Sequence, residues 1–328
     1  MNILVTGGAG YVGSHIVRKL VENKHKVTVY DNLSQGHEDA VDKKAVLVMA
    51  EMADKSKLNL VLKKHKINAV MHMAAYVSVE ESVNNPRKYF ANNVDNGIIL
   101  LEAMKKNNIH NLVFSSSSVV YGTKTKMPIK EDASTVPENP YGETKLIFEN
   151  ILEKEEASGI KSISLRYFNA AGADASGNIG EDHRPETHLI PTILREVLNN
   201  NLCINVFGND YNTRDGTAVR DYVHVSDLAD AHVLALEKLS DGHKTDVFNL
   251  GNEKGYSVLE IIKSVEKVTG KKFQIKIKGR RHGDIPIAIA DSGKARKEMK
   301  WKPELDEINT IISTAWKWHK NFPNGYKK

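Results

Sequence analysis

The chain has 328 residues, of which 41% are hydrophobic and 27% are charged, a balance typical of a globular protein with a sizeable core. The formal net charge is +5, and the basic residues are scattered along the sequence, which disfavours a nucleic-acid partner. The sequence has no apolar run long enough to span a membrane and no recognisable signal peptide, so no membrane partner is expected. Cys203 is the only cysteine, so we expect no intrachain disulfide and a cytoplasmic location.

Short β-rich runs alternate with longer amphipathic stretches through the first half of the chain, which is the pattern of βαβ units. Strands are expected at Asn2–Thr6, Lys26–Tyr30, Ala45–Met49, Ala69–His72, Asn111–Ser115 and Ser162–Arg166. Helices are expected at Tyr11–Asn23, Lys57–His65, Asn96–Lys106 and Tyr141–Ala157. This order predicts an α/β fold with a doubly wound, parallel, Rossmann-type sheet, whose ligands bind beyond the carboxyl ends of the strands.

The pattern changes after about Asn169, where Asn, Gly, Asp and Pro become frequent and the later elements are shorter. We therefore expect one domain over residues 1–168 and a smaller C-terminal α/β substrate domain over residues 169–328. Part of Asp221–Gly251 is expected to return and pack on the first domain.

A glycine-rich turn, Gly7-Gly8-Ala9-Gly10-Tyr11-Val12-Gly13, joins the first strand to the first helix. Glycines allow a tight turn and a close approach of backbone to ligand, and a helix N-terminus offers free N–H groups to a pyrophosphate. The next strand ends at Asp31, whose carboxylate suits the adenosine ribose hydroxyls and would repel a 2′-phosphate. The pattern favours bound NAD over NADP, with a purely structural turn as the alternative.

Tyr141 and Lys145 lie four residues apart at the start of a predicted helix, so both can face the same cleft. An ionised phenol at neutral pH needs a pKa about three units below that of free tyrosine, which corresponds to about 4 kcal/mol. A lysine about 4 Å away supplies this free energy only at an effective dielectric constant of about 20, so the pair must be partly desolvated. Ser117, in the serine run after strand Asn111–Ser115, can hydrogen-bond a reacting alcohol. Each motif alone also arises by chance, but together they predict a catalytic site.

These motifs resemble those of the extended short-chain dehydrogenase/reductase family, and in particular its nucleotide-sugar epimerases. The resemblance spans essentially the whole chain and includes Arg166-Tyr167-Phe168-Asn169, Phe207-Gly208-Asn209-Asp210-Tyr211, Arg220-Asp221-Tyr222-Val223-His224-Val225 and Arg280-Arg281-His282-Gly283-Asp284. It implies an isomerase of galactose metabolism that interconverts UDP-glucose and UDP-galactose. In that reaction C4 is oxidised with bound NAD, the keto sugar rotates, and C4 is reduced on its other face.

The resemblance also implies roles for individual residues. Tyr141 would be the base, Lys145 would hold the nicotinamide ribose and tune the phenol, and Ser117 would bond the sugar O4. The cofactor would be bound by these residues together with Gly7, Gly10, Tyr11, Val12, Gly13, Asp31, Asn32, Glu51, Met52, Met73, Ala74, Ala75, Asn92, Ser115 and Phe168. The UDP-sugar would be bound by Ser117, Asn169, His188, Leu189, Asn205, Phe207, Arg220, Arg281, Asp284 and Ala288. No metal is expected. The resemblance implies a homodimer that pairs through helices of the first domain, for which Asn96–Lys106 and Tyr141–Ala157 are the candidates, although amphipathic helices this long also pack internally.

Several positions depart from the family's usual residues. Glu51 stands where an aspartate is usual, and Val77 stands where some members have a lysine near the phosphates, so we expect weaker retention of NAD. His188 replaces a frequent asparagine and can still donate a hydrogen bond. By the same resemblance, Ala288 takes the position of a gate over the sugar, where a tyrosine restricts the substrate. We therefore expect UDP-N-acetylglucosamine and UDP-N-acetylgalactosamine to react as well; the alternative is that Tyr256 or His188 fills the space.

Other functions remain open from the sequence. A related 4-epimerase of UDP-xylose or UDP-glucuronate shares every motif above, and a non-catalytic NAD-binding regulator would keep the glycine-rich turn. A 4,6-dehydratase is disfavoured, because such enzymes carry Thr-Asp-Glu where this chain has Ser117-Ser118-Val119.

Overall fold

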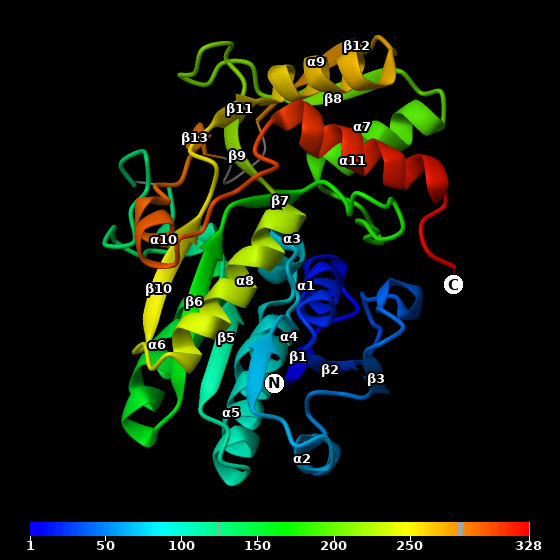
Figure 1. Cartoon of the computed structure of the whole chain (residues 1–328). Coiled ribbons are helices and arrows are strands. Elements are labelled where there is room, and N and C mark those ends of the chain that lie inside the picture. The colour runs from blue at the N-terminus through cyan, green and yellow to red at the C-terminus, as the bar shows by residue number, and fades with distance from the viewer. Residues whose placement is uncertain (124, 281–284, 328) are drawn as a thin grey trace.

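A seven-stranded sheet organises the computed structural model, which describes residues 1–123, 125–280 and 285–327 (Figure 1). Every neighbouring pair of its strands is parallel. Across the sheet the strands are β10 (Asp246–Leu250), β6 (Lys161–Tyr167), β5 (Asn111–Ser115), β4 (Ala69–His72), β1 (Asn2–Thr6), β2 (Lys26–Asp31) and β3 (Val46–Met49). The predicted doubly wound parallel sheet is thereby confirmed.

Helices cover both faces of this sheet, each through its own apolar core. On one face α1 (Tyr11–Glu22) and α8 (Val225–Ser240) pack against the strands, and on the other α2 (Lys55–Lys64), α5 (Asn96–Lys106) and α6 (Pro140–Glu155) do so. The short helices α3 (Val79–Asn84) and α4 (Pro86–Phe90) and the π-helical turn η2 (Ala91–Asp95) lead into α5. None of the helices described is long and apolar enough to cross a bilayer.

The six predicted strands and four predicted helices of the first half form within two residues of the expected bounds. The central strands β1, β4 and β5 are buried almost throughout, which agrees with their continuous apolar runs. Strand β10 and helix α8 complete the sheet and its cover from the region after Asn169. Strand β9 (Val219–His224), in the same region, belongs instead to a second, smaller sheet.

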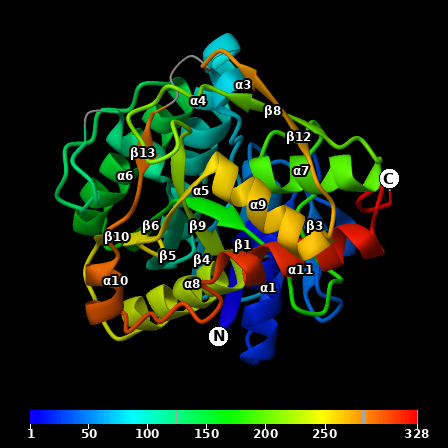
Figure 2. The same ribbon diagram turned by 90° about the horizontal axis from the view of Figure 1, so that it is seen from above.

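That second sheet lies beyond the carboxyl ends of the parallel strands (Figure 1). It contains β11 (Gly255–Ser257), β9 and β13 (Ile287–Ala288), with β7 (Asn169–Ala171) also paired to β9. Strands β8 (Cys203–Phe207) and β12 (Gln274–Lys278) form a separate pair. Helices α7 (Leu189–Leu198), α9 (Val258–Thr269) and α11 (Ile308–Asn321) pack together around a third apolar core (Figure 2).

The remaining elements are short. Helix α10 (Gly293–Glu298) packs against β10. Among the described residues, three 3₁₀ turns occur, η1 (Glu38–Ala40), η3 (Ser118–Tyr121) and η4 (Glu156–Ser158). Turn η3 follows β5 directly and so lies where ligands bind in sheets of this kind.

Candidate active site

The glycine-rich turn connects β1 to α1 at the carboxyl edge of the large sheet. Gly7 has a φ of 68°, and a Cβ there would lie 2.6 Å from the backbone nitrogen of Ala74. A Cβ on Gly13 would collide with the Gly7 carbonyl oxygen. Only glycine at these two positions lets α1 begin so close to β1 and to the end of β4.

The N-terminus of α1 fits a dinucleotide pyrophosphate. Gly10 is its N-cap residue and has no side chain to satisfy the first N–H groups, and the first turn contains no acidic residue. A Cβ added to Gly10 would approach only the Gly7 carbonyl oxygen, at 3.4 Å, among the residues described. Backbone N–H groups at this position are therefore available to an anion, as the sequence predicts.

Asp31 is held rigidly at the end of β2. Its carboxylate accepts hydrogen bonds from the backbone nitrogens of Ala9 and Leu33, at 3.0 and 2.9 Å, and the residue is 8% exposed. Burial raises the pKa of this carboxyl, although both backbone hydrogen bonds lower it. Beside it, the Asn32 amide donates to Glu51 at 3.0 Å, so the longer glutamate already has a hydrogen-bond partner.

The structure places the other predicted cofactor residues along the same edge. They lie at or within three residues after the carboxyl ends of β3, β4, β5 and β6, except Asn92, which lies in the π-helical turn and donates to the Asn93 side chain. These residues are Glu51, Met52, Met73, Ala74, Ala75, Ser115 and Phe168. Because the carboxyl ends of parallel strands share one edge, residues far apart in sequence lie along one line.

Tyr141, Lys145 and Ser117 come together beside this line. Tyr141 and Lys145 lie in the first two turns of α6, whose N-cap is Asn139, and the Lys145 ammonium lies 5.9 Å from the centre of the Tyr141 ring. Ser117, the residue before η3, hydrogen-bonds the phenol. The Lys145 ammonium donates to the Ser115 carbonyl oxygen at 2.6 Å, which fixes α6 against the end of β5.

Burial dominates the electrostatics of this constellation. Tyr141 is 8% exposed and Lys145 is 2% exposed. Burial raises the pKa of the Tyr141 phenol, the nearby Tyr167 raises it further, and the Ser117 hydrogen bond lowers it. Burial also lowers the pKa of Lys145 to about 7, although Glu149 favours its charged form. In the protein alone, desolvation therefore disfavours both charges of the predicted phenolate–ammonium pair.

A buried ion pair lies behind Lys145. Glu149, one turn further along α6, binds the Arg166 guanidinium of β6 with nitrogen–oxygen distances of 2.5–3.2 Å, and both side chains are at most 7% exposed. Arg166 also donates to the Tyr121 hydroxyl, which donates to Asn249 of β10. The network joins α6, β6, η3 and β10. No motif in the sequence assigned Glu149 to the site. Its spacing of four residues from Lys145 would have indicated that both side chains lie on the same face of the helix.

The predicted substrate residues lie in the C-terminal part of the chain, on several elements. Asn169 lies in β7, His188 and Leu189 begin α7, Asn205 and Phe207 lie in β8, Arg220 lies in β9 and Ala288 lies in β13. Arg281 and Asp284 lie outside the described residues. Ala288 pairs with Arg220 in neighbouring strands and packs against the cluster that contains Phe168, which connects it to the cofactor edge. Asn205 is exposed, and its neighbours in β8 are the residues that reach the apolar core.

Comparison with known proteins agrees with this arrangement. The model of the NAD dependent epimerase/dehydratase family matches residues 3–251. The UDP-glucose 4-epimerase of Lactobacillus helveticus is 51% identical over 328 residues, which cover 100% of this chain and 99% of that protein.

Solved structures of such enzymes share the whole fold. One crystal structure of a UDP-glucose 4-epimerase superposes with a TM-score of 0.97 at 45% identity and covers 100% of both chains. The enzyme from Bifidobacterium longum, solved in complex with NAD⁺ and UDP, has a TM-score of 0.93 at 37% identity and covers 99% of this chain and 100% of that one. The chain therefore belongs to the NAD dependent epimerase/dehydratase family, among the UDP-glucose 4-epimerases.

Proposed function

We propose that this chain interconverts UDP-glucose and UDP-galactose by inverting C4 of the sugar with bound NAD. One observation carries the proposal: Tyr141, Lys145 and Ser117 converge at the carboxyl edge of the sheet, beside a glycine-rich turn that fits a pyrophosphate. The similar enzyme from B. longum, solved with NAD⁺ and UDP, supports both the cofactor and the nucleotide.

Each residue of the constellation has a separate task. Bound NAD would supply the reversible redox chemistry at C4. Tyr141 removes the proton from the sugar O4 and later returns it, and Ser117, which already bonds the phenol, bonds the same oxygen. Lys145, held by the Ser115 carbonyl, keeps a positive charge near the phenol when it is protonated. Because burial disfavours the phenolate, a further positive charge, such as that of an oxidised nicotinamide, is needed to stabilise it.

Adding UDP-glucose to the purified protein and recording its ultraviolet spectrum tests this function. We expect new absorbance from reduced cofactor on the enzyme, together with UDP-glucose formed from UDP-galactose in a coupled assay. A regulator that only binds NAD would show neither signal. A UDP-xylose or UDP-glucuronate epimerase would turn over those sugars in preference to UDP-galactose.

Asp31 is expected to select NAD over NADP, because two backbone hydrogen bonds fix its carboxylate where it would face a 2′-phosphate. Nucleotide extracted from the purified protein should be NAD, at less than one molecule per chain after long dialysis, since Glu51 replaces the usual aspartate and Val77 replaces the lysine that some members have. Asp31→Asn should reduce the preference for NAD. The matched control is Asp42→Asn, which alters a carboxylate that likewise accepts a backbone N–H two residues on. Recovered NADP would refute the role of Asp31, and full occupancy would refute weak retention.

Ala288 is expected to admit N-acetylated sugars, so the parent protein should epimerise UDP-N-acetylglucosamine beside UDP-glucose. Its small side chain packs against the cluster that contains Phe168, and a tyrosine there would occupy the space of a 2-acetamido group. Overpacking a closed pocket costs roughly 1–3 kcal/mol. Ala288→Tyr should therefore suppress turnover of the N-acetylated sugar by about 5- to 150-fold and spare UDP-galactose, while Ala288→Ser should change neither. No turnover by the parent, at enzyme concentrations that consume UDP-galactose readily, would contradict the idea.

We also propose a reducing, cytoplasmic setting for this chain, whose single cysteine, Cys203, is free.

We further propose that the chain forms a homodimer that pairs through α5 and α6. Analytical ultracentrifugation tests the dimer. A monomer at micromolar concentration would exclude the dimer.

A further inference from the structure

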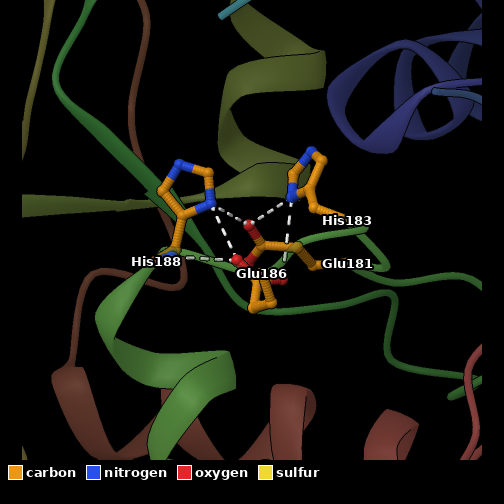
Figure 3. A group of neighbouring side chains, drawn as sticks. All are labelled: Glu181, His183, Glu186 and His188. Atoms are coloured by element: carbon orange, nitrogen blue, oxygen red, sulfur yellow. Dashed lines mark hydrogen bonds and ion pairs between the residues drawn. The ribbon is translucent and has the colours of Figure 1, made fainter. Parts of the chain in front are cut away.

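Four potential metal ligands converge in the segment before α7. Glu181, His183, Glu186 and His188, here called the 181–188 cluster, each direct one ligand atom into a common volume, and these atoms all lie within 4.8 Å of one another. Figure 3 shows the two imidazole rings on either side of the two carboxylates, with all four side chains pointing inward. The catalytic chemistry proposed above assigns no task to Glu181, His183 or Glu186.

The distances from the two imidazole nitrogens to the carboxylate oxygens of the cluster are close to those between the ligands of a tetrahedral metal ion. His183 Nδ1 lies 3.1 Å from Glu181 Oε1 and 3.7 Å from Glu186 Oε2. His188 Nδ1 lies 2.8 Å from Glu181 Oε1 and 3.2 Å from Glu186 Oε1. Ligand atoms about 2.0–2.1 Å from a tetrahedral Zn²⁺ are about 3.3 Å from one another, which is the middle of this range.

Hydrogen bonding within the cluster is incomplete. Glu186 Oε1 accepts from the backbone nitrogens of Thr187 and His188, both at 2.9 Å. Glu186 Oε2 has no hydrogen-bond partner among the described residues, and the Glu186 side chain is only 4% exposed. His183 Nδ1 also meets no hydrogen-bond geometry among them, but it lies within ion-pair distance of Glu181 Oε1. The separation of 3.7 Å between Glu186 Oε2 and His183 Nδ1 is too long for a hydrogen bond, and Arg195 approaches Oε2 only to 4.0 Å. The buried Glu186 Oε2 therefore keeps a lone pair that a cation can share with His183 Nδ1, which faces it at 3.7 Å.

The surrounding residues hold the ligands in place. Asp182, between two of them, binds Arg184 at 2.8 Å and Arg195 of α7 at 2.9 Å and accepts from the backbone nitrogen of Tyr326. The backbone oxygen of Glu181 accepts from the Trp318 indole at 3.2 Å. Such outer contacts orient the ligands of metal sites in proteins.

We propose that the 181–188 cluster binds one divalent transition-metal ion, Zn²⁺ by its ligand chemistry, through two imidazole nitrogens and two carboxylate oxygens. Imidazole suits zinc and its neighbours, and four protein ligands close the coordination sphere, as in structural sites. The ion fastens residues 181–188 to the start of α7 and takes no part in the redox chemistry. It lies near the glycine-rich turn, because the His183 ring packs edge-on against the Tyr11 ring.

A second group of this kind provides a control. His243, Asp246 and Glu298 also lie within reach of a common ion, but the Lys294 ammonium already binds Asp246 at 2.5 Å. A lysine in that position occupies the place of a cation, so we assign no metal there.

Cobalt titration of the purified full-length protein tests the proposal, because Co²⁺ replaces Zn²⁺ and absorbs visible light intensely when its site is tetrahedral. After removal of metal with a chelator, the parent should bind one Co²⁺ with a tetrahedral spectrum, and Zn²⁺ should displace it. Glu186→Gln and His183→Gln should each weaken binding at least tenfold, since even outer-shell changes cost 10–100-fold at metal sites, roughly. His243→Gln should bind as the parent does. His188 is left unchanged, because it is also predicted to contact substrate.

Thermal unfolding provides a second measurement. Zn²⁺ should raise the Tm of the parent and of His243→Gln and leave the Tm of the two cluster variants unchanged. If the variants do not fold, X-ray absorption of the metal-loaded parent still decides, because two imidazole donors are expected. No binding by the parent, an octahedral spectrum, or equal binding by Glu186→Gln and His183→Gln would overturn the proposal.

Discussion

Tyr141→Phe is expected to lower kcat for UDP-galactose by about 10²–10⁴-fold, the usual contribution of a general acid or base. The phenol is buried beside Lys145 and bonds Ser117, so its hydroxyl is the proton acceptor that the constellation presents to O4. Removing one oxygen leaves the ring and its packing intact, so bound NAD and the midpoint of thermal unfolding should change little. Steady-state kinetics, nucleotide extraction and unfolding measure the three quantities on the same preparation.

Tyr326→Phe is the matched control, because it also removes a buried hydroxyl, here one that accepts from the backbone nitrogen of Gly180. This variant should keep the parental kcat even if it loses stability. A Tyr141→Phe rate within a few-fold of the parent would exclude Tyr141 as the base.

The pH profile gives a further readout of the same residue. Burial raises the pKa of the phenol, so its ionised fraction is small at neutral pH and grows as the pH rises. Because the base must be ionised to accept a proton, kcat of the parent should fall as the pH is lowered. The pKa of Lys145 is about 7, so loss of its charge at higher pH should make the rise shallower than one ionisation alone would give. Tyr141→Phe should lose this dependence.

Glu149→Gln is expected to destabilise the protein by about 3–5 kcal/mol, because it leaves the Arg166 guanidinium buried without its counter-charge. Both side chains are at most 7% exposed, so solvent cannot replace the lost carboxylate. The free energy of unfolding, from urea titrations followed by circular dichroism, measures the loss.

Glu102→Gln provides the comparison at the surface, where Glu102 pairs with Lys55 and both side chains are more than half exposed. Exposed pairs of this kind contribute about 0–1 kcal/mol, so this variant should unfold almost as the parent does. If both substitutions cost the same, the buried network does not hold α6 against β6.

Local patterns in the sequence were enough to predict the first part of the fold. Buried parallel strands are continuous apolar runs, and the glycine-rich turn marks where the first strand meets its helix, so β1, β4 and α1 were expected close to where they lie. The turn also predicted the place of Asp31. The return of part of Asp221–Gly251 to the first domain was also expected, but the position of β10 in the sheet was not. Strand β10 pairs with β6 across about eighty intervening residues, and short β-rich runs do not specify their partners.

The electrostatics of the site needed the structure. From the sequence, desolvation was expected only to strengthen the attraction of Lys145 for an ionised Tyr141. In the folded chain burial is the largest influence on both groups, and it disfavours the charged form of each. Whether the attraction between Tyr141 and Lys145 outweighs their desolvation depends on how deeply the two groups are buried. The four-residue spacing in the sequence does not give that depth. The sequence also did not predict that the four side chains of the 181–188 cluster converge, because their arrangement depends on the path of the loop before α7.

The position of β10 affects how the chain can fold as it leaves the ribosome. Until residue 250 has been synthesised, β6 has no partner on its outer side, and the face that α8 covers remains open to water. An unpaired, buried-type strand readily joins the strands of other chains. We therefore expect the first 168 residues made alone to associate and precipitate, and nascent chains of that length to depend on chaperones. We therefore expect the first 168 residues to fold stably only together with the later part of the chain that supplies α8 and β10.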